Sequence, residues 1–185
     1  MTQRRIYQDE YPYFVTFRTK ENSLIFEETK YAELLSKIML NSGKLKGYNI
    51  LSYQIMPDHA HLLTIKLSDR TLENVRSGGC SMVNKTSERT LSRVRSGNSK
   101  QQLDKSSKQY TISDLLQSIK GNFSRKIHSG NIWQKRFYTR IINNQEYLTT
   151  ITEYIKQNPV KQKLPNKYHR LPYQFFNWRE IKSLF

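Results

Sequence analysis

Residues 48–65 read YNILSYQIMPDHAHLLTI, and the fold depends on how this stretch is organised. The runs YNILSYQI (48–55) and LLTI (62–65) are rich in β-branched and aromatic residues, which favour β-strands. Between them lies Pro57-Asp58, a pair that is typical of a turn. The stretch therefore predicts two neighbouring strands joined by a tight connection.

Two of the four histidines of the chain lie in this connection, one residue apart. Side chains at alternate positions of a strand point to the same face, so His59 and His61 are expected to project together from the first residues of the second strand. Two convergent imidazoles are half of a metal site. Two partly exposed or hydrogen-bonded histidines would give the same pattern, so the motif alone leaves both interpretations open.

The rest of the chain alternates strand-like and helix-like segments around this pair. Two more strands are predicted, YFVTFRT (13–19) and IWQKRFYTRII (132–142). Three helices are predicted at 26–43 with Gly43 as its end, at 111–130 with Thr111 or Ser113 as cap and Gly130 as end, and at 144–159 with Pro159 as end. The order β-α-β-β-α-β-α predicts an α+β fold, a ferredoxin-like split βαβ antiparallel sheet with an added C-terminal helix.

A long polar interval, about 67–110, separates the second predicted helix from the strand pair. It is crowded with Ser, Arg, Lys, Gly and Asn, and its one aromatic residue, Tyr110, lies at its far edge. Such a segment buries little apolar area, so we expect a mobile insertion within one domain spanning 1–185. The basic, aromatic tail at about 160–185 would either pack on the sheet or stack on bases, and packing is the expectation.

The charge balance indicates a polyanionic partner. The chain has 31 Lys and Arg against 15 Asp and Glu, a net charge of +16, together with 12 Tyr, 8 Phe and 2 Trp. Thirteen of the basic residues and three of the acidic ones lie between 120 and 185. Positive charge interleaved with aromatic rings favours nucleic acid, whose bases can stack, over an anionic membrane surface, although a basic surface with no partner has the same composition.

Composition also indicates the compartment. Cys80 is the single cysteine of the chain, so no intramolecular disulfide forms and a reducing compartment is expected. The chain has neither a signal-like apolar segment at its start nor a run of about 18 apolar residues. We therefore expect a soluble, cytoplasmic protein that makes no membrane contact.

The predicted helix at 144–159 places chemically distinctive side chains on one face. Tyr147, Ile151, Tyr154 and Asn158 follow one another at i, i+4, i+7 and i+11, which is the spacing of a single helix face. A phenol and an amide one turn apart would then face the same way. Asn before Pro is also a common way to leave a helix, so a purely structural role for Asn158 stays open.

These motifs together resemble a known family. MPDHAHLL (56–63) resembles the paired-histidine signature of HUH endonucleases. YIKQNPVK (154–161) resembles the tyrosine-bearing helix of the single-tyrosine HUH transposases, of which the REP-associated tyrosine transposases are the nearest. YFVTFRT (13–19) and IWQKRFY (132–138) also resemble that family, so the likeness extends over about 10–165 apart from the insertion.

The resemblance implies a role for each matching residue. His59 and His61 match the paired metal ligands, Asn158 matches the third ligand, and Tyr154 matches the nucleophile. The implied activity is cleavage and rejoining of single-stranded DNA beside a hairpin through a 5′-phosphotyrosine. The implied cofactor is Mg²⁺ or Mn²⁺, and the protein would act as a monomer or a homodimer.

The residue types suit this chemistry. A divalent ion polarises an anionic phosphodiester for in-line attack, and mixed N/O donors bind Mn²⁺ or Mg²⁺. A tyrosine phenol, with a reference pKa of about 10, ionises more readily than a serine hydroxyl. Tyr138 and Tyr147 are rival nucleophiles, although neither has an Asn four residues later. A binding module without catalysis, or a nuclease that uses activated water, is the alternative function.

Several basic residues near these motifs are candidates for phosphate contacts. They lie on the second long helix, on the strand after it and after the tyrosine helix: Lys120, Arg125, Lys126, Lys135, Arg136, Arg140, Lys161 and Lys163. Any one of them taken alone is more often a solvated surface charge than a specific contact. As a group they predict strongly salt-dependent binding of DNA.

Overall fold

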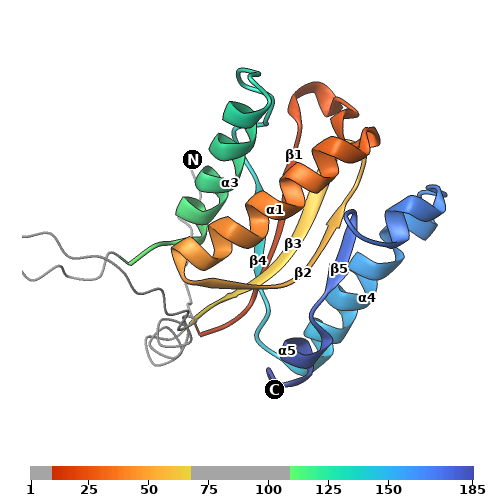
Figure 1. The fold of residues 1–185 in the computed structure, drawn as a ribbon. Coiled ribbons are helices and arrows are strands. Elements are labelled where there is room, and N and C mark those ends of the chain that lie inside the picture. The colour runs from red at the N-terminus through yellow and green to blue at the C-terminus, as the bar shows by residue number, and fades with distance from the viewer. Residues whose placement is uncertain (1–9, 68–108) are drawn as a thin grey trace, which may run out of the picture.

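The strand pair predicted around Pro57 lies at the centre of a five-stranded sheet in the computed structural model, which describes residues 10–67 and 109–185 (Figure 1). The strands are β1 (Tyr13–Arg18), β2 (Tyr48–Ile55), β3 (His59–Lys66), β4 (Tyr138–Ile141) and β5 (Gln174–Phe176). Their order is β4-β1-β3-β2-β5, and all neighbouring pairs are antiparallel. The α-helices of the described residues are α1 (Thr29–Lys46), α3 (Ile112–Lys126), α4 (Gln145–Lys161) and α5 (Trp178–Lys182).

The first four strands form a split βαβ arrangement. β1 and β2, which α1 connects, lie on either side of β3, and β3 and β4 lie on either side of β1. The α+β class and this strand order are therefore as predicted from the sequence. β5 was not predicted, and it widens the sheet by pairing with β2.

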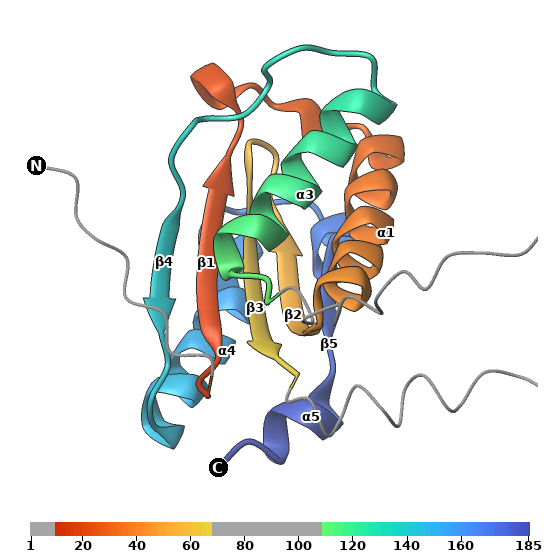
Figure 2. The same ribbon diagram turned by 90° about the vertical axis from the view of Figure 1, so that its left-hand side faces the viewer.

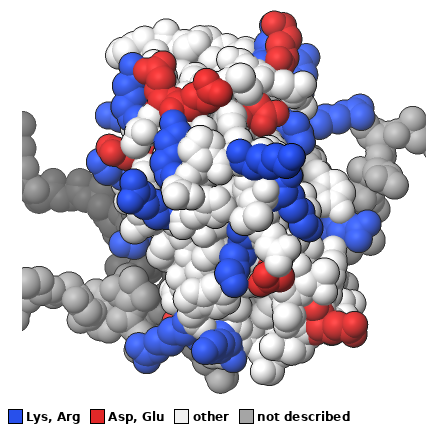
Figure 3. Space-filling view, turned by 90° about the vertical axis from the view of Figure 1, so that its right-hand side faces the viewer, with Lys and Arg blue, Asp and Glu red and all other residues white. Residues whose placement is uncertain are grey.

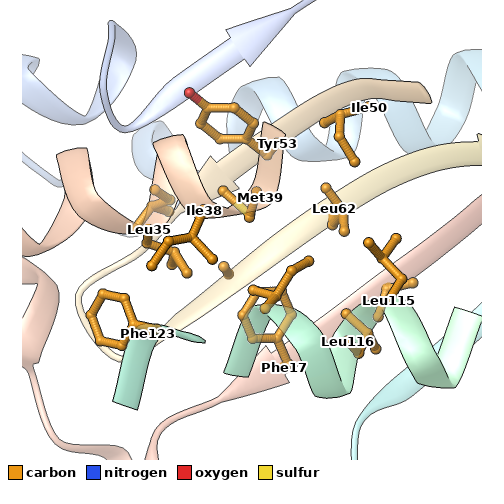
Figure 4. Close-up of a cluster of buried hydrophobic side chains, with 14 of the residues drawn as sticks. Phe17, Leu35, Ile38, Met39, Ile50, Tyr53, Leu62, Leu115, Leu116 and Phe123 are labelled. Atoms are coloured by element: carbon orange, nitrogen blue, oxygen red, sulfur yellow. The ribbon is translucent and has the colours of Figure 1, made fainter. Parts of the chain in front are cut away.

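Different helices cover the two faces of the sheet (Figures 1 and 2). Alternate residues of β1 divide between them: Val15 and Phe17 pack with α1 and α3, whereas Phe14 packs with α4 and α5. Figure 4 shows the first cluster, in which Phe17 and Leu62 of the sheet lie against side chains of both α1 and α3. We call the opposite face, covered by α4 and α5, the α4 face.

Helix α1 ends three residues later than the predicted stop at Gly43. Gly43 is buried inside the helix, and a Cβ there would lie 2.9 Å from the Tyr48 carbonyl oxygen. Its missing side chain lets α1 approach β2 closely. Gly47, with φ of 71°, ends the helix in the left-handed conformation that glycine adopts most easily.

Of the two candidate caps of the next helix, the structure selects Thr111. Its Oγ1 accepts from the Asp114 backbone N–H at 3.3 Å, and Asp114 Oδ2 accepts from the Thr111 N–H at 2.8 Å. This reciprocal pair is a capping box. The helix ends at Lys126, so the predicted end at Gly130 was wrong.

The predicted strand at 132–142 is shorter than expected, because β4 contains 138–141 alone. Trp133, near the start of the predicted segment, turns into the core instead: it is 4% exposed, and its indole Nε1 donates to the Lys120 carbonyl oxygen at 3.1 Å. The backbone of Trp133 forms an isolated antiparallel bridge with Thr19, and the regular strand begins at Tyr138.

The prediction that Pro159 ends the helix carrying Tyr154 was wrong, because α4 continues to Lys161. Proline has no N–H, so one helical hydrogen bond is lost at this position. The following donors are nevertheless satisfied: Gln162 N–H binds the Asn158 carbonyl at 3.1 Å, and Leu164 N–H binds the Pro159 carbonyl at 2.9 Å.

The C-terminal tail packs on the sheet, as expected. Tyr168 and Tyr173 are 2% and 1% exposed, and their ring centroids lie 4.4 Å apart. Ile181 of α5 joins the apolar cluster of the α4 face. Burial thus explains Tyr168 and Tyr173, whereas Trp178 and Phe185 are 45% and 52% exposed.

Two predictions concern residues outside the described ranges. The insertion at 67–110 is described at Leu67, Gln109 and Tyr110 alone, and Cys80 lies within its undescribed part. Among the described residues, no helix combines the length and the apolar character that a membrane span requires.

The two helical glycines Gly43 and Gly121 give a matched test of the fold. We expect Gly43→Ala to destabilise the protein by about 1–3 kcal/mol, because its Cβ would press on the backbone of β2. Gly121→Ala has open space around its Cβ and should stabilise α3 by about 0.5–1 kcal/mol. Urea unfolding of both variants measures the difference. Equal effects would show that the close approach of α1 to β2 does not constrain the fold.

Candidate functional site

Both histidine side chains lie on the α4 face at the start of β3. Each residue is 3% exposed, and the two Nε2 atoms are 3.2 Å apart. The sheet register places His61 between Thr16 of β1 and Gln54 of β2. The prediction that the two imidazoles project together is correct, and they are buried in the protein.

The other ring nitrogen of each histidine has its own partner. His59 Nδ1 pairs with the Asp58 carboxylate, and His61 Nδ1 lies 2.8 Å from Thr16 Oγ1. A carboxylate can only accept, so His59 donates from Nδ1 and presents the lone pair of Nε2. The Thr16 hydroxyl can accept as well, which permits the same tautomer in His61. Such partners fix the ring orientation of metal-binding histidines.

Asp58 is itself held in place by Arg18, the last residue of β1, and by Thr19, which follows β1. The Arg18 guanidinium lies 3.0 Å from the Asp58 carboxylate. The Asp58 carbonyl oxygen accepts from the Thr19 N–H at 2.9 Å and from the Thr19 hydroxyl at 2.8 Å. Backbone and side chain of Asp58 are therefore both fixed, and so is the orientation of His59.

Both imidazoles are kept neutral. Burial, with a smaller effect of the neighbouring His59, lowers the pKa of His61 to about 3. Burial also lowers the pKa of His59, while Asp58 acts in the opposite direction. Two neutral Nε2 atoms at 3.2 Å either share a proton in a hydrogen bond or present two lone pairs to one cation. Neutral, convergent and fixed nitrogens are what a divalent metal ion requires.

Tyr154 of α4 lies directly against this pair. Its ring centroid is 5.4 Å from that of His61 and 5.9 Å from that of Phe14. Phe14 also stacks on His61, at 5.6 Å and 17° between planes. Tyr154 is 38% exposed, and Lys161 Nζ lies 5.8 Å from its ring centroid. The phenol thus lies at the solvent boundary of the histidine site, next to a positive charge.

Asn158 follows Tyr154 by one helical turn and is 5% exposed. Its Nδ2 is buried and has no hydrogen-bond partner among the described residues. α4 runs in the opposite direction to β3, so Asn158 lies toward the end of β3 that carries His59 (Figure 1). The two ends of an amide differ little in shape, so either can point at a ligand. The unpaired atom is a donor, so a bound cation would be coordinated by the amide oxygen, with the amide group turned by about 180°.

The amide also fits the composition of the site. Within residues 10–67 and 109–185, no three His, Cys, Asp or Glu side chains are grouped so as to hold a metal ion. A third protein ligand from these residues would be of another type, and the resemblance to the HUH family assigns this role to Asn158. The residues present therefore fit a divalent ion with two nitrogen donors, one amide oxygen and open positions.

Sequence reasoning missed three residues that support the histidines: Thr16, Arg18 and Asp58. The signal was available in part, because Thr16 and Arg18 alternate with the apolar residues of β1 and Asp58 precedes His59 directly. What the sequence alone did not provide was the register of β1 against β3, which places Thr16 opposite His61 and Arg18 opposite His59.

The rival tyrosines are placed differently. Tyr138 of β4 is 49% exposed and contacts Phe14 at 6.4 Å between ring centroids. The Tyr147 hydroxyl accepts a hydrogen bond from Arg140 at 3.4 Å. Of the three tyrosines weighed, Tyr154 is the one whose ring contacts His61.

The eight basic candidates fall in three places. Arg140 of β4 and Lys161 lie on the α4 face, and Lys163 follows the end of α4. Lys120, Arg125 and Lys126 belong to α3, on the other face of the sheet. Lys135 and Arg136 are exposed in the segment that connects α3 to β4. Figure 3 shows Lys and Arg side chains spread over the α4 side of the molecule, with acidic ones gathered mainly toward its upper end.

Comparison with solved structures gives a match of fold. A REP-associated tyrosine transposase, solved bound to a REP hairpin, matches with a TM-score of 0.63 and 19% identity over 100% of this chain and 88% of the other. A Deinococcus radiodurans R1 protein with a provisional transposase name matches with a TM-score of 0.43 and 18% identity, over 85% of this chain and 97% of the other. No protein-family model and no curated protein matches the sequence. The first match confirms, for the fold, the resemblance that the motifs predicted.

The partners of the histidines give a prediction about metal affinity. We expect Thr16→Val and Asp58→Asn each to weaken Mn²⁺ binding about 10- to 100-fold, because each loosens the orientation of one imidazole. Titration followed by electron paramagnetic resonance measures the affinity without any DNA.

His61→Ala should bind more weakly still, and Glu33→Gln, at an exposed position of α1, should bind as the unaltered protein does. Undiminished affinity in both Thr16→Val and Asp58→Asn would contradict the assigned role of these two side chains.

Proposed function

We propose that the protein is a metal-dependent transposase that cleaves and rejoins single-stranded, hairpin-associated DNA through a 5′-phosphotyrosine. The observation that carries this proposal is the 5.4 Å contact between the rings of Tyr154 and His61, beside Nε2 atoms that converge to 3.2 Å. A nucleophile from α4 and two ligands from β3 thus share one site. The motif resemblance and the similarity in fold to a transposase support the same reading.

The metal ligands in this proposal are His59 Nε2, His61 Nε2 and the side-chain oxygen of Asn158. A divalent ion held there, Mg²⁺ or Mn²⁺, would polarise a nonbridging oxygen of the scissile phosphate. Burial of the imidazoles keeps them neutral and available as ligands. Asp58 and Thr16 bind the Nδ1 atoms of His59 and His61 and so keep the Nε2 atoms of these histidines pointed at the site.

Tyr154 supplies the nucleophile. Its phenol gives up a proton to solvent, and the oxygen attacks phosphorus in line with the 3′-oxygen of the neighbouring nucleotide. The bond from phosphorus to the 3′-oxygen breaks, and that oxygen takes a proton from water. The products are a 5′-phosphotyrosine and a 3′-OH. Attack by a 3′-OH in the reverse direction rejoins a strand and releases Tyr154 without ATP.

The proposed substrate is single-stranded DNA with a hairpin. The solved transposase of the same fold is bound to a REP hairpin, and this chain carries the basic and aromatic composition that such a ligand requires. Lys161, next to the Tyr154 ring, places positive charge where the scissile phosphate would lie. A hairpin that reached the basic residues of both α3 and α4 would have to pass around β4, the edge strand between them.

The first experiment tests for a covalent adduct on a denaturing gel. Labelled single-stranded hairpins from the DNA that flanks the gene would be incubated with the protein and Mn²⁺, Mg²⁺ or chelator. We expect a labelled protein band that requires metal and disappears in Tyr154→Phe and His59→Ala. Tyr147→Phe, on the same helix, is the matched control and should retain the band.

Other outcomes separate the alternatives. Cleavage without a protein band, unaffected by Tyr154→Phe, would indicate a nuclease that uses water. Binding on native gels with no cleavage under any metal would indicate a binding module. A band that survives in Tyr154→Phe and is lost in Tyr147→Phe would move the nucleophile to Tyr147.

Salt dependence tests the phosphate contact near the nucleophile. Each phosphate neutralised on a single strand contributes about 0.7 to the slope of log affinity against log salt concentration. We expect Lys161→Gln to lower that slope by about this amount and to weaken binding of a hairpin at low salt. Lys37→Gln, at an exposed position of α1 on the other face, should leave the slope unchanged. An identical slope in both variants would remove Lys161 from the DNA site.

A further inference from the structure

We propose that Tyr138 and Arg140 of β4 form a site for one unpaired nucleotide beside the cleaved bond. The Tyr138 ring stacks on the base, and the Arg140 guanidinium binds the adjoining phosphate. This inference rests on the proposed function and assigns to two side chains a part of DNA binding that the His59, His61 and Tyr154 site does not provide.

Tyr138 is an exposed ring at the end of a chain of aromatic contacts. It is 49% exposed and meets Phe14 edge-on, with 6.4 Å between centroids and 72° between planes. Phe14, 5% exposed, contacts both Tyr154 and His61. The packing on Phe14 holds the Tyr138 ring in place while about half of the residue stays open to solvent. An aromatic side chain held in this way is suited to base stacking.

The sheet register places this ring near the histidine site. Tyr138 pairs with Thr16, and Thr16 pairs with His61, so the three lie in one row across β4, β1 and β3. Strands are spaced about 4.8 Å apart, so the backbones of Tyr138 and His61 are separated by about 10 Å along this row. A base on Tyr138 and a phosphate at the histidines can therefore belong to the same or to adjacent nucleotides.

Arg140 is arranged beside the ring. It lies two residues further along β4 and so on the same face. Its Nη1 donates to the Tyr147 hydroxyl of α4 at 3.4 Å, and its guanidinium is 5.8 Å from the centroid of the Tyr138 ring. The side chain is thereby directed across the α4 face, and its remaining donors suit a phosphate oxygen.

The charge of the surroundings selects an anionic partner. β4 is an edge strand, and the exposed Lys135 and Arg136 precede it. The stretch from 131 to 143 contains neither Asp nor Glu. A partner that combines flat apolar rings with negative charge fits this edge, and single-stranded DNA has that chemistry.

Equilibrium binding to Tyr154→Phe protein tests the site independently of cleavage. Hairpins with an unpaired flank would carry 2-aminopurine at one position at a time, and a second set would carry an abasic residue at the same positions. With Tyr138 present, we expect 2-aminopurine to be quenched at one position next to the cleaved bond. Adding Tyr138→Leu should abolish this quenching and lower the affinity for the hairpin about tenfold. Tyr138→Phe should retain the quenching and the affinity, and Tyr31→Leu, on the other face of the sheet, should change neither quantity.

The abasic flank completes the test. With the base removed at the sensitive position, Tyr138→Leu should cost no further affinity, because the ring would then have no partner. Arg140→Gln should weaken binding to the intact and abasic flanks equally, since the phosphate is still present. Quenching that persists in Tyr138→Leu, or an equal loss on both flanks, would overturn the proposal.

The outcome is distinguishable from failure of the proposed function. If the unaltered protein formed no adduct but Tyr138 still quenched one position, the nucleotide site would stand and the strand-transfer chemistry would fall. If the adduct formed and no position responded to Tyr138→Leu, the chemistry would stand and the nucleotide site would fall.

Discussion

The alternation of side chains along β3 is the constraint on which the rest of the structure depends. Ala60 and Leu62 belong to the apolar cluster under α1 and α3, whereas His59, His61 and Leu63 point to the α4 face. β3 is paired along both edges, with β1 and with β2, so neither neighbour can slip independently. A shift of one residue would turn both imidazoles into the apolar cluster under α1 and α3 and would move Ala60 and Leu62 out of it. The strand that completes the main core therefore also fixes the two histidines.

The α4 face accommodates buried polar groups at a cost in stability. His59, His61 and Gln54 are buried there, and the buried Nδ2 of Asn158 and Oγ of Ser52 lack hydrogen-bond partners within the described residues. Each unsatisfied buried polar group costs about 1–3 kcal/mol relative to a paired one. Apolar side chains at these positions would be more stable, and the proposed metal and DNA site is the function that would offset this cost.

How far the sequence determines this picture differs from element to element. The strand pair and the convergence of His59 with His61 follow from the alternation of side chains along β2 and β3, and the topology follows from the order of the elements. Gly43 and Pro159 misled because their local preferences were outweighed: Gly43 is needed where α1 approaches β2, and the buried Pro159 is tolerated in the last turn of α4. The three-residue strand β5 has no pattern of its own and forms because β2 offers an edge. The role of Thr16 required the β1–β3 register, which no local pattern supplies.

The position of Tyr154 depends on a separate set of contacts. α4 is attached to the sheet by Leu148, Ile151 and Ile155, whose spacing is one helix face, and Tyr154 and Asn158 lie beside that stripe. On the side of His61 away from β1, Gln54 of β2 is its neighbour in the sheet register. The Gln174 amide of β5 donates to the Gln54 side chain at 2.7 Å and to the Lys156 carbonyl oxygen of α4 at 3.2 Å. These contacts connect the position of His61 in the sheet to the backbone of Lys156, two residues after Tyr154. Apolar packing and this hydrogen bond together hold α4 against the sheet, and with it the Tyr154 ring beside His61.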